Sequence, residues 1–260
     1  MAASAALLGL LLAGCATSPL GRPQLKLYSD QTVGRMGLQT FQQLQKKTPL
    51  STDARLNAFV NCVAGQLTAQ TGYRANWQAK VFQSDEINAF ALPGGEIGVY
   101  SGLFKVVENQ DQLAAVLGHE IGHVIAGHVN ERLSDQALTQ VALTAAGASG
   151  AGQGTMALMG LGAQVGILLP FSRTQESEAD LIGLDLMSRA GFDPRQAVVL
   201  WQNMQQATAG KAPPELLSDH PADARRIQQI RARLPQDLPI YRQARAGGRQ
   251  PDCGAAQHAH

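Results

Sequence analysis

The sequence predicts an α+β fold that is mostly helical, with a small β-sheet in the first half of the chain. Apolar residues recur at helical spacing over most of the 260 residues, and 45% of the residues are hydrophobic, which is enough for one buried core. The pattern changes only between residues 77 and 100, where short β-prone runs flank a Pro-Gly-Gly turn. No internal repeat is visible.

The first two helices are predicted over residues 30–47 and 53–71. The second begins at the polar run STDARL, which resembles a helix N-terminus. Its apolar positions share one helical face: Leu56, Phe59, Val60, Val63 and Leu67. Strands are then expected at WQAKVFQ (residues 77–83) and EIGVY (residues 96–100), on either side of NAFALPGG.

A long helix is predicted from a cap at Asn109 or Asp111 to about Leu133. Further helices are expected at residues 173–190 and 194–207. After a Pro-rich break at 212–214, a last helix should run from about Pro221 to Leu234.

Residues 136–172 carry no charged side chain and are rich in Ala, Gly, Leu and Met. A transmembrane helix is one interpretation. Gly, Gln, Ser and Thr dilute the hydrophobicity of the stretch below that of a typical span. We therefore expect a buried or membrane-skimming helical hairpin, close to the functional site.

The N-terminus resembles the leader of a bacterial lipoprotein. Residues 1–14 form an apolar run that is too short to span a bilayer and has the length of a signal peptide. The run ends in Leu-Ala-Gly-Cys, which resembles a lipobox and implies lipidation of Cys15. No Lys or Arg precedes the run, which departs from the usual pattern, so an ordinary secretory peptide or a buried helix are the alternatives.

The lipobox resemblance implies a location in the bacterial periplasm. Ala16 and Thr17 follow the cysteine, and neither is the Asp that typically retains lipoproteins in the inner membrane. We therefore expect an anchor in the inner leaflet of the outer membrane, with residues 15–29 as lipidated N-terminus and tether. Residues 30–243 would form one catalytic domain and residues 244–260 a tail.

Two cysteines remain, Cys62 and Cys253, and they can pair in an oxidising compartment. The alternative is a buried Cys62 and a free Cys253. The net charge of +1, with no basic block, gives no reason to expect a nucleic-acid partner. Charged residues make up only 16% of the chain, which fits an enzyme that works near a surface.

A histidine cluster, LGHEIGHVIAGH, carries the chemistry. His119 and His123 are four residues apart, so on a helix they lie on one face and can share a metal ion. Glu120 can reach a water bound to that ion. This is the H-E-x-x-H pattern of zinc proteases, with two ligands and a general base.

His128 is the third histidine of the cluster. At about 100° per residue it points roughly 140° away from His123 for as long as the helix continues. It lies five residues after His123, which does not match the six-residue spacing of metzincins. We therefore interpret it as a structural residue or as a partner of a ligand.

A third metal ligand is expected in RTQESEAD. Glu176 and Asp180 are four residues apart and share a helical face. Glu176 can bind the metal, while Asp180 can accept a hydrogen bond from a ligating imidazole and set its tautomer. Glu178 lies between them, and we expect it on a solvated face.

Four blocks of this sequence together resemble the gluzincin metallopeptidases, the family of the CAAX prenyl endopeptidase, HtpX and BepA. They occur in the family's order and spacing between residues 30 and 235: NAFALPGGEIGVYSGL, DQLAAVLGHEIGHVIAGH, RTQESEAD and SDHPADARRI. The small size and the lipobox are most similar to LoiP-like periplasmic lipoproteins. The resemblance implies a zincin-type metalloprotease domain whose sheet has an edge strand beside the active-site cleft.

The resemblance also implies residue roles. One Zn²⁺ per chain would be held by His119, His123 and Glu176. Substrate backbone is expected to pair with the edge strand, which implicates Asn88, Ala89 and the strand around Gly98. His220 of the His-Pro motif would act at the zinc, either blocking the water site as a latch or assisting the oxyanion, with Arg226 as a nearby polar partner.

The expected function is zinc-dependent hydrolysis of peptide bonds in unfolded or misassembled envelope proteins. The rival is a chaperone-like assembly factor for outer-membrane proteins, working with outer-membrane assembly machinery, in which proteolysis is secondary or latched. A lipid-processing or CAAX-type enzyme is a weaker third interpretation, because the long multi-span architecture is absent from the sequence.

Overall fold

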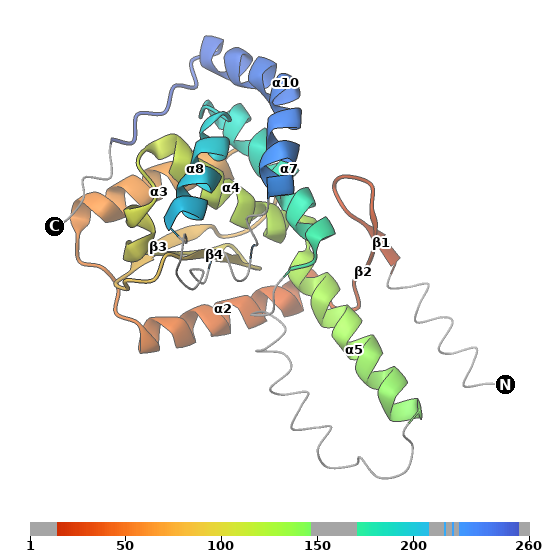
Figure 1. Ribbon diagram of the computed structural model, residues 1–260. Coiled ribbons are helices and arrows are strands. Elements are labelled where there is room, and N and C mark those ends of the chain that lie inside the picture. The colour runs from red at the N-terminus through yellow and green to blue at the C-terminus, as the bar shows by residue number, and fades with distance from the viewer. Residues whose placement is uncertain (1–14, 147–170, 208–215, 217–219, 221–223, 255–260) are drawn as a thin grey trace.

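The structure is a computed structural model that describes residues 15–146, 171–207, 216, 220 and 224–254. The predicted signal peptide (1–14), most of the uncharged stretch (147–170), the Pro-rich break at 212–214 and the last residues (255–260) lie outside the described residues. Within the described part, the predicted mostly helical fold with a small sheet is confirmed (Figure 1).

The N-terminal segment is folded rather than extended. β1 (Cys15–Thr17) and β2 (Pro23–Leu25) form an antiparallel hairpin within residues 15–29, which are predicted from the sequence to be a tether. α2 (Asp30–Lys47) begins at Ser29, whose side chain accepts a hydrogen bond from the backbone of Thr32. The predicted helix over 53–71 is observed as α3 (Ala54–Thr68), capped by Asp53.

The central sheet has three strands in the order β3-β5-β4. β5 (Glu96–Tyr100) pairs in parallel with β3 (Gln78–Phe82) and antiparallel with β4 (Ala89–Leu92). Gly94 and Gly95 have φ of +108° and +109°, which explains the glycines of the predicted Pro-Gly-Gly turn.

The expectation that the strand around Gly98 is the edge strand is wrong. β5 is the middle strand, so both of its sides are hydrogen-bonded to neighbours and cannot receive a substrate. Gly98 instead lies under the Phe90 ring, since a Cβ there would come within 2.1 Å of it. The edge strand that follows Asn88 is β4, which includes Ala89.

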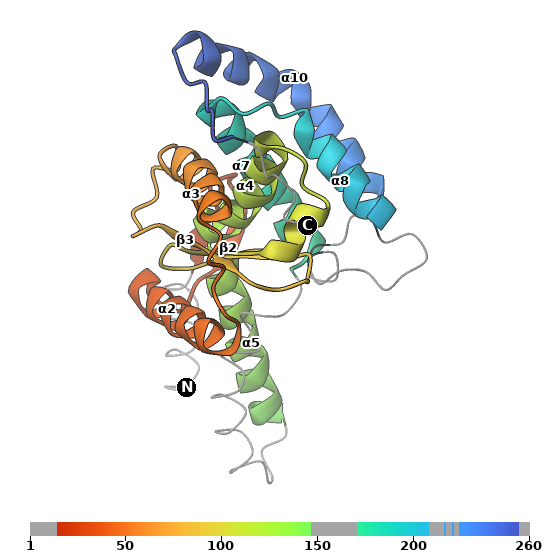
Figure 2. The same cartoon turned by 90° about the vertical axis from the view of Figure 1, so that its left-hand side faces the viewer.

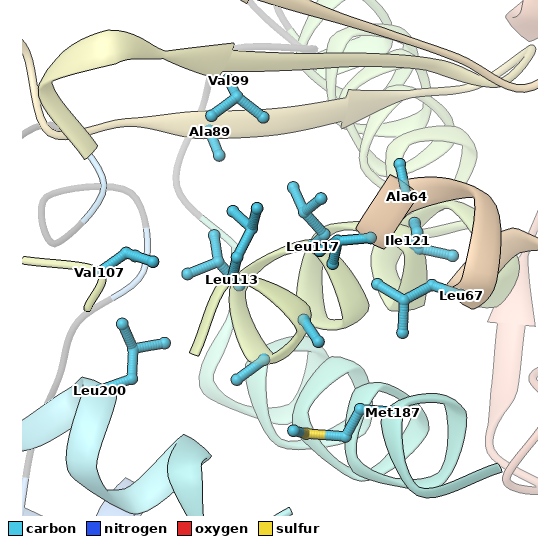
Figure 3. Packing of buried hydrophobic residues seen from close by; sticks show 14 of the residues in the cluster. Ala64, Leu67, Ala89, Val99, Val107, Leu113, Leu117, Ile121, Met187 and Leu200 are labelled. Atoms are coloured by element: carbon cyan, nitrogen blue, oxygen red, sulfur yellow. The ribbon is translucent and has the colours of Figure 1, made fainter. Parts of the chain in front are cut away.

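Helices cover both faces of the sheet (Figures 1 and 2). Alternation along the strands sends Phe82, Leu92 and Tyr100 to the face that packs on α2. The opposite side chains pack with α3 and α4 (Gln110–Ala126) in the larger core. Figure 3 shows Leu113 and Leu117 of α4 pointing toward the sheet, and Ile121 of α4 lying beside Ala64 and Leu67 of α3.

The predicted long helix ending near Leu133 is two helices. α4 ends where Gly127 adopts left-handed φ of 70°, and α5 (His128–Ala146) begins at the next residue. Glycine allows this conformation without a steric penalty, so the chain turns there. α5 then points away from the body of the molecule (Figure 1).

α4 packs most extensively on α7 (Arg173–Ala190), and small residues bring the two backbones together. A Cβ on Gly183 would lie 2.8 Å from the backbone of Gly118, and one on Gly122 would lie 2.7 Å from the carbonyl oxygen of Ala179. A 3₁₀ turn (Ser101–Lys105) links β5 to α4, and α8 (Gln196–Ala207) follows α7.

The last helix, α10 (Ala224–Ala246), is longer than the predicted segment ending at Leu234. It continues through Pro235 and Pro239 and changes direction along its length (Figure 1). Proline inside a helix bends it rather than always ending it, which is why the sequence rule failed here.

A disulfide joins Cys62 on α3 to Cys253 after α10, across 191 residues of sequence. It holds the chain beyond α10 against the body. Of the two alternatives that the sequence allows for these cysteines, the structure therefore shows the disulfide rather than two free thiols.

Among the described residues, no helix is both long enough and apolar enough to cross a membrane.

Candidate metal centre

Four buried side chains bring possible metal-binding atoms to one point. α4 contributes His119 and His123, α7 contributes Glu176, and His220 precedes α10. One donor atom from each lies within 4.8 Å of all the others. The structure therefore brings together the three ligands that the sequence predicted and His220, which the family resemblance implies at the metal.

The distances fit a four-coordinate ion. Nε2 of His119 lies 3.1 Å from Nε2 of His123 and 3.1 Å from Nδ1 of His220. Glu176 Oε1 lies 2.8 Å from His220 Nδ1 and 3.4 Å from His123 Nε2. A tetrahedron with metal–nitrogen bonds of about 2.1 Å has edges of roughly 3.4 Å, so these residues suit a metal ion.

His119 is held by a carboxylate and an arginine. Its Nδ1 lies 2.9 Å from Asp180 Oδ1, which leaves Nε2 directed at the donor cluster. The guanidinium of Arg226 donates to both oxygens of Asp180, at 2.7 and 2.8 Å, and stacks on Trp201 at 3.6 Å. Asp180 thus contacts Nδ1 of a histidine, the position in which the sequence places it. Arg226, which is expected near His220, donates to the carbonyl oxygen of His220 at 3.4 Å and also pairs with Asp180.

His123 is held from the other side by His128. Because α4 ends at Gly127, His128 turns back and its Nδ1 lies 2.9 Å from Nδ1 of His123. Its Nε2 lies 3.2 Å from Glu178 Oε2. The expectation of a solvated Glu178 is therefore wrong, because this side chain is buried against α5 and the N-terminal hairpin.

Burial and hydrogen bonding set the charges of the donors. Burial holds the pKa of His123 well below its usual value, so this imidazole is neutral at pH 7 and its lone pair is free for a metal. Burial alone would raise the pKa of Glu176, but the surrounding histidines bring that pKa far below its usual value, so Glu176 is a carboxylate. Asp180 is also buried, which would raise its pKa. Its contacts with Arg226 and His119 outweigh this effect and lower the pKa of Asp180 below its usual value.

Glu120 follows His119 in α4 and is buried beside the donors. Its Oε1 lies 3.5 Å from His220 Nε2. It therefore lies at the cluster without being one of the four donors, as a general base must.

Phe171 covers one side of the cluster. Its ring stacks on His123 at 3.8 Å, and the guanidinium of Arg132 lies 3.6 Å over the same ring. Neither residue is predicted from the sequence, because the pattern around each indicates only a helix or an uncharged stretch.

The residues expected to bind substrate lie on the sheet. The carbonyl oxygen of Asn88 accepts a hydrogen bond from the backbone of Tyr100 at 3.0 Å, and β4 begins at Ala89. Of the expected set, Ala89 is the first residue of the edge strand β4 and Asn88 directly precedes it, whereas Gly98 lies in the central strand β5.

An H-E-x-x-H helix, a glutamate from a second helix and a small sheet together define a zincin-type metallopeptidase domain. Peptidase family M48 matches this chain over residues 50–234, and the chain belongs to that family.

Two kinds of relative are similar over much of the chain. The mitochondrial metalloendopeptidase OMA1 of Schizosaccharomyces pombe is 39% identical over 183 residues, which cover 68% of this chain and 53% of the relative. The beta-barrel assembly-enhancing protease of Escherichia coli strain K12 is 33% identical over 221 residues, which cover 81% of this chain and 45% of the relative. The chain thus spans about half the length of these relatives.

Proposed function

We propose that this protein is a zinc-dependent endopeptidase. The observation that carries the proposal is the convergence of His119, His123 and Glu176 beside Glu120 in a buried site. Two imidazoles and a carboxylate are the donors of catalytic zinc sites in peptidases, which leave one position for water. Membership of peptidase family M48 supports the same activity.

Zinc bound by these residues supplies a Lewis acid that lowers the pKa of water and polarises the scissile carbonyl. The chain's own residues do the rest. Glu120 accepts the proton of the attacking water and delivers it to the leaving amine. Asp180 and His128 hold the proton on Nδ1 of His119 and His123, so that each Nε2 remains a ligand.

The proposed substrates are unfolded or misassembled proteins. An extended segment of a substrate can pair with β4, the edge strand that begins at Ala89. Strand pairing depends on backbone hydrogen bonds more than on particular side chains. Such recognition suits a chain that has lost its fold.

The proposed site of action is the bacterial periplasm, with lipidated Cys15 anchoring the protein to the inner leaflet of the outer membrane. The similarity to a beta-barrel assembly-enhancing protease of Escherichia coli supports a role in the quality control of envelope proteins. The OMA1 relatives are mitochondrial by name, so the domain itself is compatible with more than one compartment.

One observation favours a second candidate. Nδ1 of His220 lies 3.1 Å from His119 Nε2 and 2.8 Å from Glu176 Oε1, and would thus take the fourth coordination position, which a catalytic zinc site leaves for water. We therefore also consider an assembly factor for outer-membrane proteins, one that works with the assembly machinery and has latched, secondary protease activity.

Glu120→Gln tests the proposed activity. The variant should bind zinc as the parent does but lose cleavage of casein, an unfolded protein, because an amide cannot accept the water's proton. Casein cleavage and zinc content measured on the same preparation provide the readout. A variant that cleaves casein as fast as the parent would show that Glu120 is not the base.

A further inference from the structure

The N-terminal hairpin carries an arginine whose charge is directed into the protein. Arg22, between β1 and β2, forms a bidentate ion pair with Glu131 of α5. Its Nη1 donates to Oε1 of Glu131, and its Nη2 donates to Oε2 at 2.7 Å. Its Nε donates to Glu178 Oε2 of α7 at 3.0 Å. The side chain of Arg22 is 25% exposed, whereas those of Glu131 and Glu178 are 9% and 4% exposed.

Neighbouring contacts hold the hairpin and Glu131, the partner of Arg22, in place. Gln24 donates to the carbonyl oxygen of Ala126, in the last turn of α4, at 2.8 Å and to Glu131 at 3.1 Å. Gln175, next to the ligand Glu176, donates to the same Glu131 oxygen at 2.9 Å. The hairpin therefore contacts the ends of the helices that carry the metal donors.

The oxygen of Glu178 that accepts from Arg22 also lies 3.2 Å from Nε2 of His128. Nδ1 of His128 lies 2.9 Å from Nδ1 of His123. If His123 presents Nε2 to a metal, its proton must be on Nδ1, and that proton is then donated to His128. His128 consequently carries its own proton on Nε2 and donates it to Glu178.

The other ligand histidine has the same arrangement. His119 is backed by Asp180, and Asp180 is held by Arg226. On the His123 side, the carboxylate of Glu178 takes the place of Asp180 and Arg22 takes the place of Arg226, with His128 inserted between imidazole and carboxylate. Each ligand histidine is thus supported by a carboxylate of α7 and each carboxylate by an arginine.

We propose that Arg22 is a positioning residue for the metal ligand His123, acting through Glu178 and His128. The hairpin is then part of the scaffold of the metal centre rather than a spacer. Arg22 follows Cys15 by seven residues, so the predicted lipid anchor is attached directly to this scaffold. The inference rests on the proposed zinc site.

The test is the zinc affinity of the full chain, measured by competition with a chelator. Arg22→Ala should weaken zinc binding roughly 10-fold, the lower end of the range for outer partners of metal ligands. Arg22→Lys keeps the positive charge but cannot form the bidentate contact of a guanidinium, so its zinc affinity should lie between those of Arg22→Ala and the parent. Arg195→Ala is the matched control, because Arg195 pairs with Asp193 on the surface and should leave affinity unchanged.

A merely structural role of Arg22 predicts a different result. Arg22→Ala would then lower the melting temperature of the zinc-free protein but leave zinc affinity at the parental value, and the proposal would be overturned. If Arg22→Ala does not fold, Glu178→Gln decides in its place. It retains the shape of the side chain and removes its charge, and an unchanged zinc affinity would overturn the proposal.

A double variant tests the route. In a His128→Phe background, Arg22→Ala should cause no further loss of zinc affinity, because Glu178 can no longer act on His123 through His128. An additive loss would show that Arg22 acts independently of His128. If the parent protein binds no zinc at all, the proposed function fails. If it binds zinc and Glu120→Gln is inactive, but Arg22→Ala binds normally, only this inference fails.

Discussion

At the residue scale, each acid of the ESEAD segment has its own partner. Glu176 faces the donor cluster, Glu178 contacts His128, and Asp180 contacts His119. Residues two apart on a helix point in different directions, so all three are buried only because α7 is enclosed on more than one side.

This arrangement explains what sequence reasoning found and missed. The spacing of four residues identified Glu176 and Asp180, because they share a helical face. Glu178 is expected in solvent because it lies off the helical face that Glu176 and Asp180 share. Periodicity does not show that the hairpin and α5 cover the face on which Glu178 lies. Arg22 lies 109 residues from Glu131 along the chain, so no local pattern connects them.

His220 yields a prediction at this scale. His220→Ala should raise the rate of casein cleavage, because removal of the imidazole opens the fourth position of the cluster to water. Rates are compared at equal zinc content, so that a loss of metal is not mistaken for a loss of catalysis. An unchanged rate would contradict a latch, and a lower rate would indicate that His220 assists the oxyanion.

At the scale of elements, the existence of helices was predicted better than their ends. The pattern through Leu133 suggested one helix, but Gly127 ends α4 and lets His128 turn back toward His123. α10 passes two prolines that the sequence rule treated as a stop. Both differences have the same reason: the sequence rules do not specify whether a particular glycine or proline ends a helix, turns the chain or only bends the helix.

Asp237 of α10 gives a prediction on pH. Its side chain is fully buried with Arg233 at 3.3 Å, and burial raises its pKa to about 6. An unfolded aspartate titrates near pH 4, so the folded state binds more protons between pH 4 and 6. The charged form therefore lowers stability as the pH rises through this window, and the cost is full above pH 6.

Asp237→Asn removes this cost. In urea unfolding of the zinc-free protein, the variant should exceed the parent in stability by roughly 2–3 kcal/mol at pH 8 and be close to it at pH 4. Asp252→Asn, at an exposed position, serves as the control. A stability difference that is the same at both pH values would refute the assignment.

At the scale of the whole molecule, the site is assembled from distant parts of the chain. The hairpin, α4, α7 and the region of α10 all contribute side chains. The order of the four family motifs predicted which segments meet. The sequence could not show which strand lies at the sheet's edge, because strand order depends on pairing between segments.

The disulfide between Cys62 and Cys253 closes a loop of 191 residues and is expected to stabilise this assembly. Cys62→Ala combined with Cys253→Ala should lower the free energy of unfolding by roughly 2–5 kcal/mol, since the unfolded chain regains the freedom that the link removes. The parent protein in reducing buffer is the matched control and should unfold like the double variant. Equal stability of the oxidised parent and the double variant would contradict the link.

The central claim is that His119, His123 and Glu176 hold a zinc ion, with His220 as fourth neighbour. An anomalous difference map, recorded at the zinc absorption edge from crystals of the zinc-loaded protein, tests it most directly. We predict one strong peak enclosed by Nε2 of both α4 histidines, a carboxylate oxygen of Glu176 and Nδ1 of His220. A map with no peak there, or with its peak at other residues, would contradict the account.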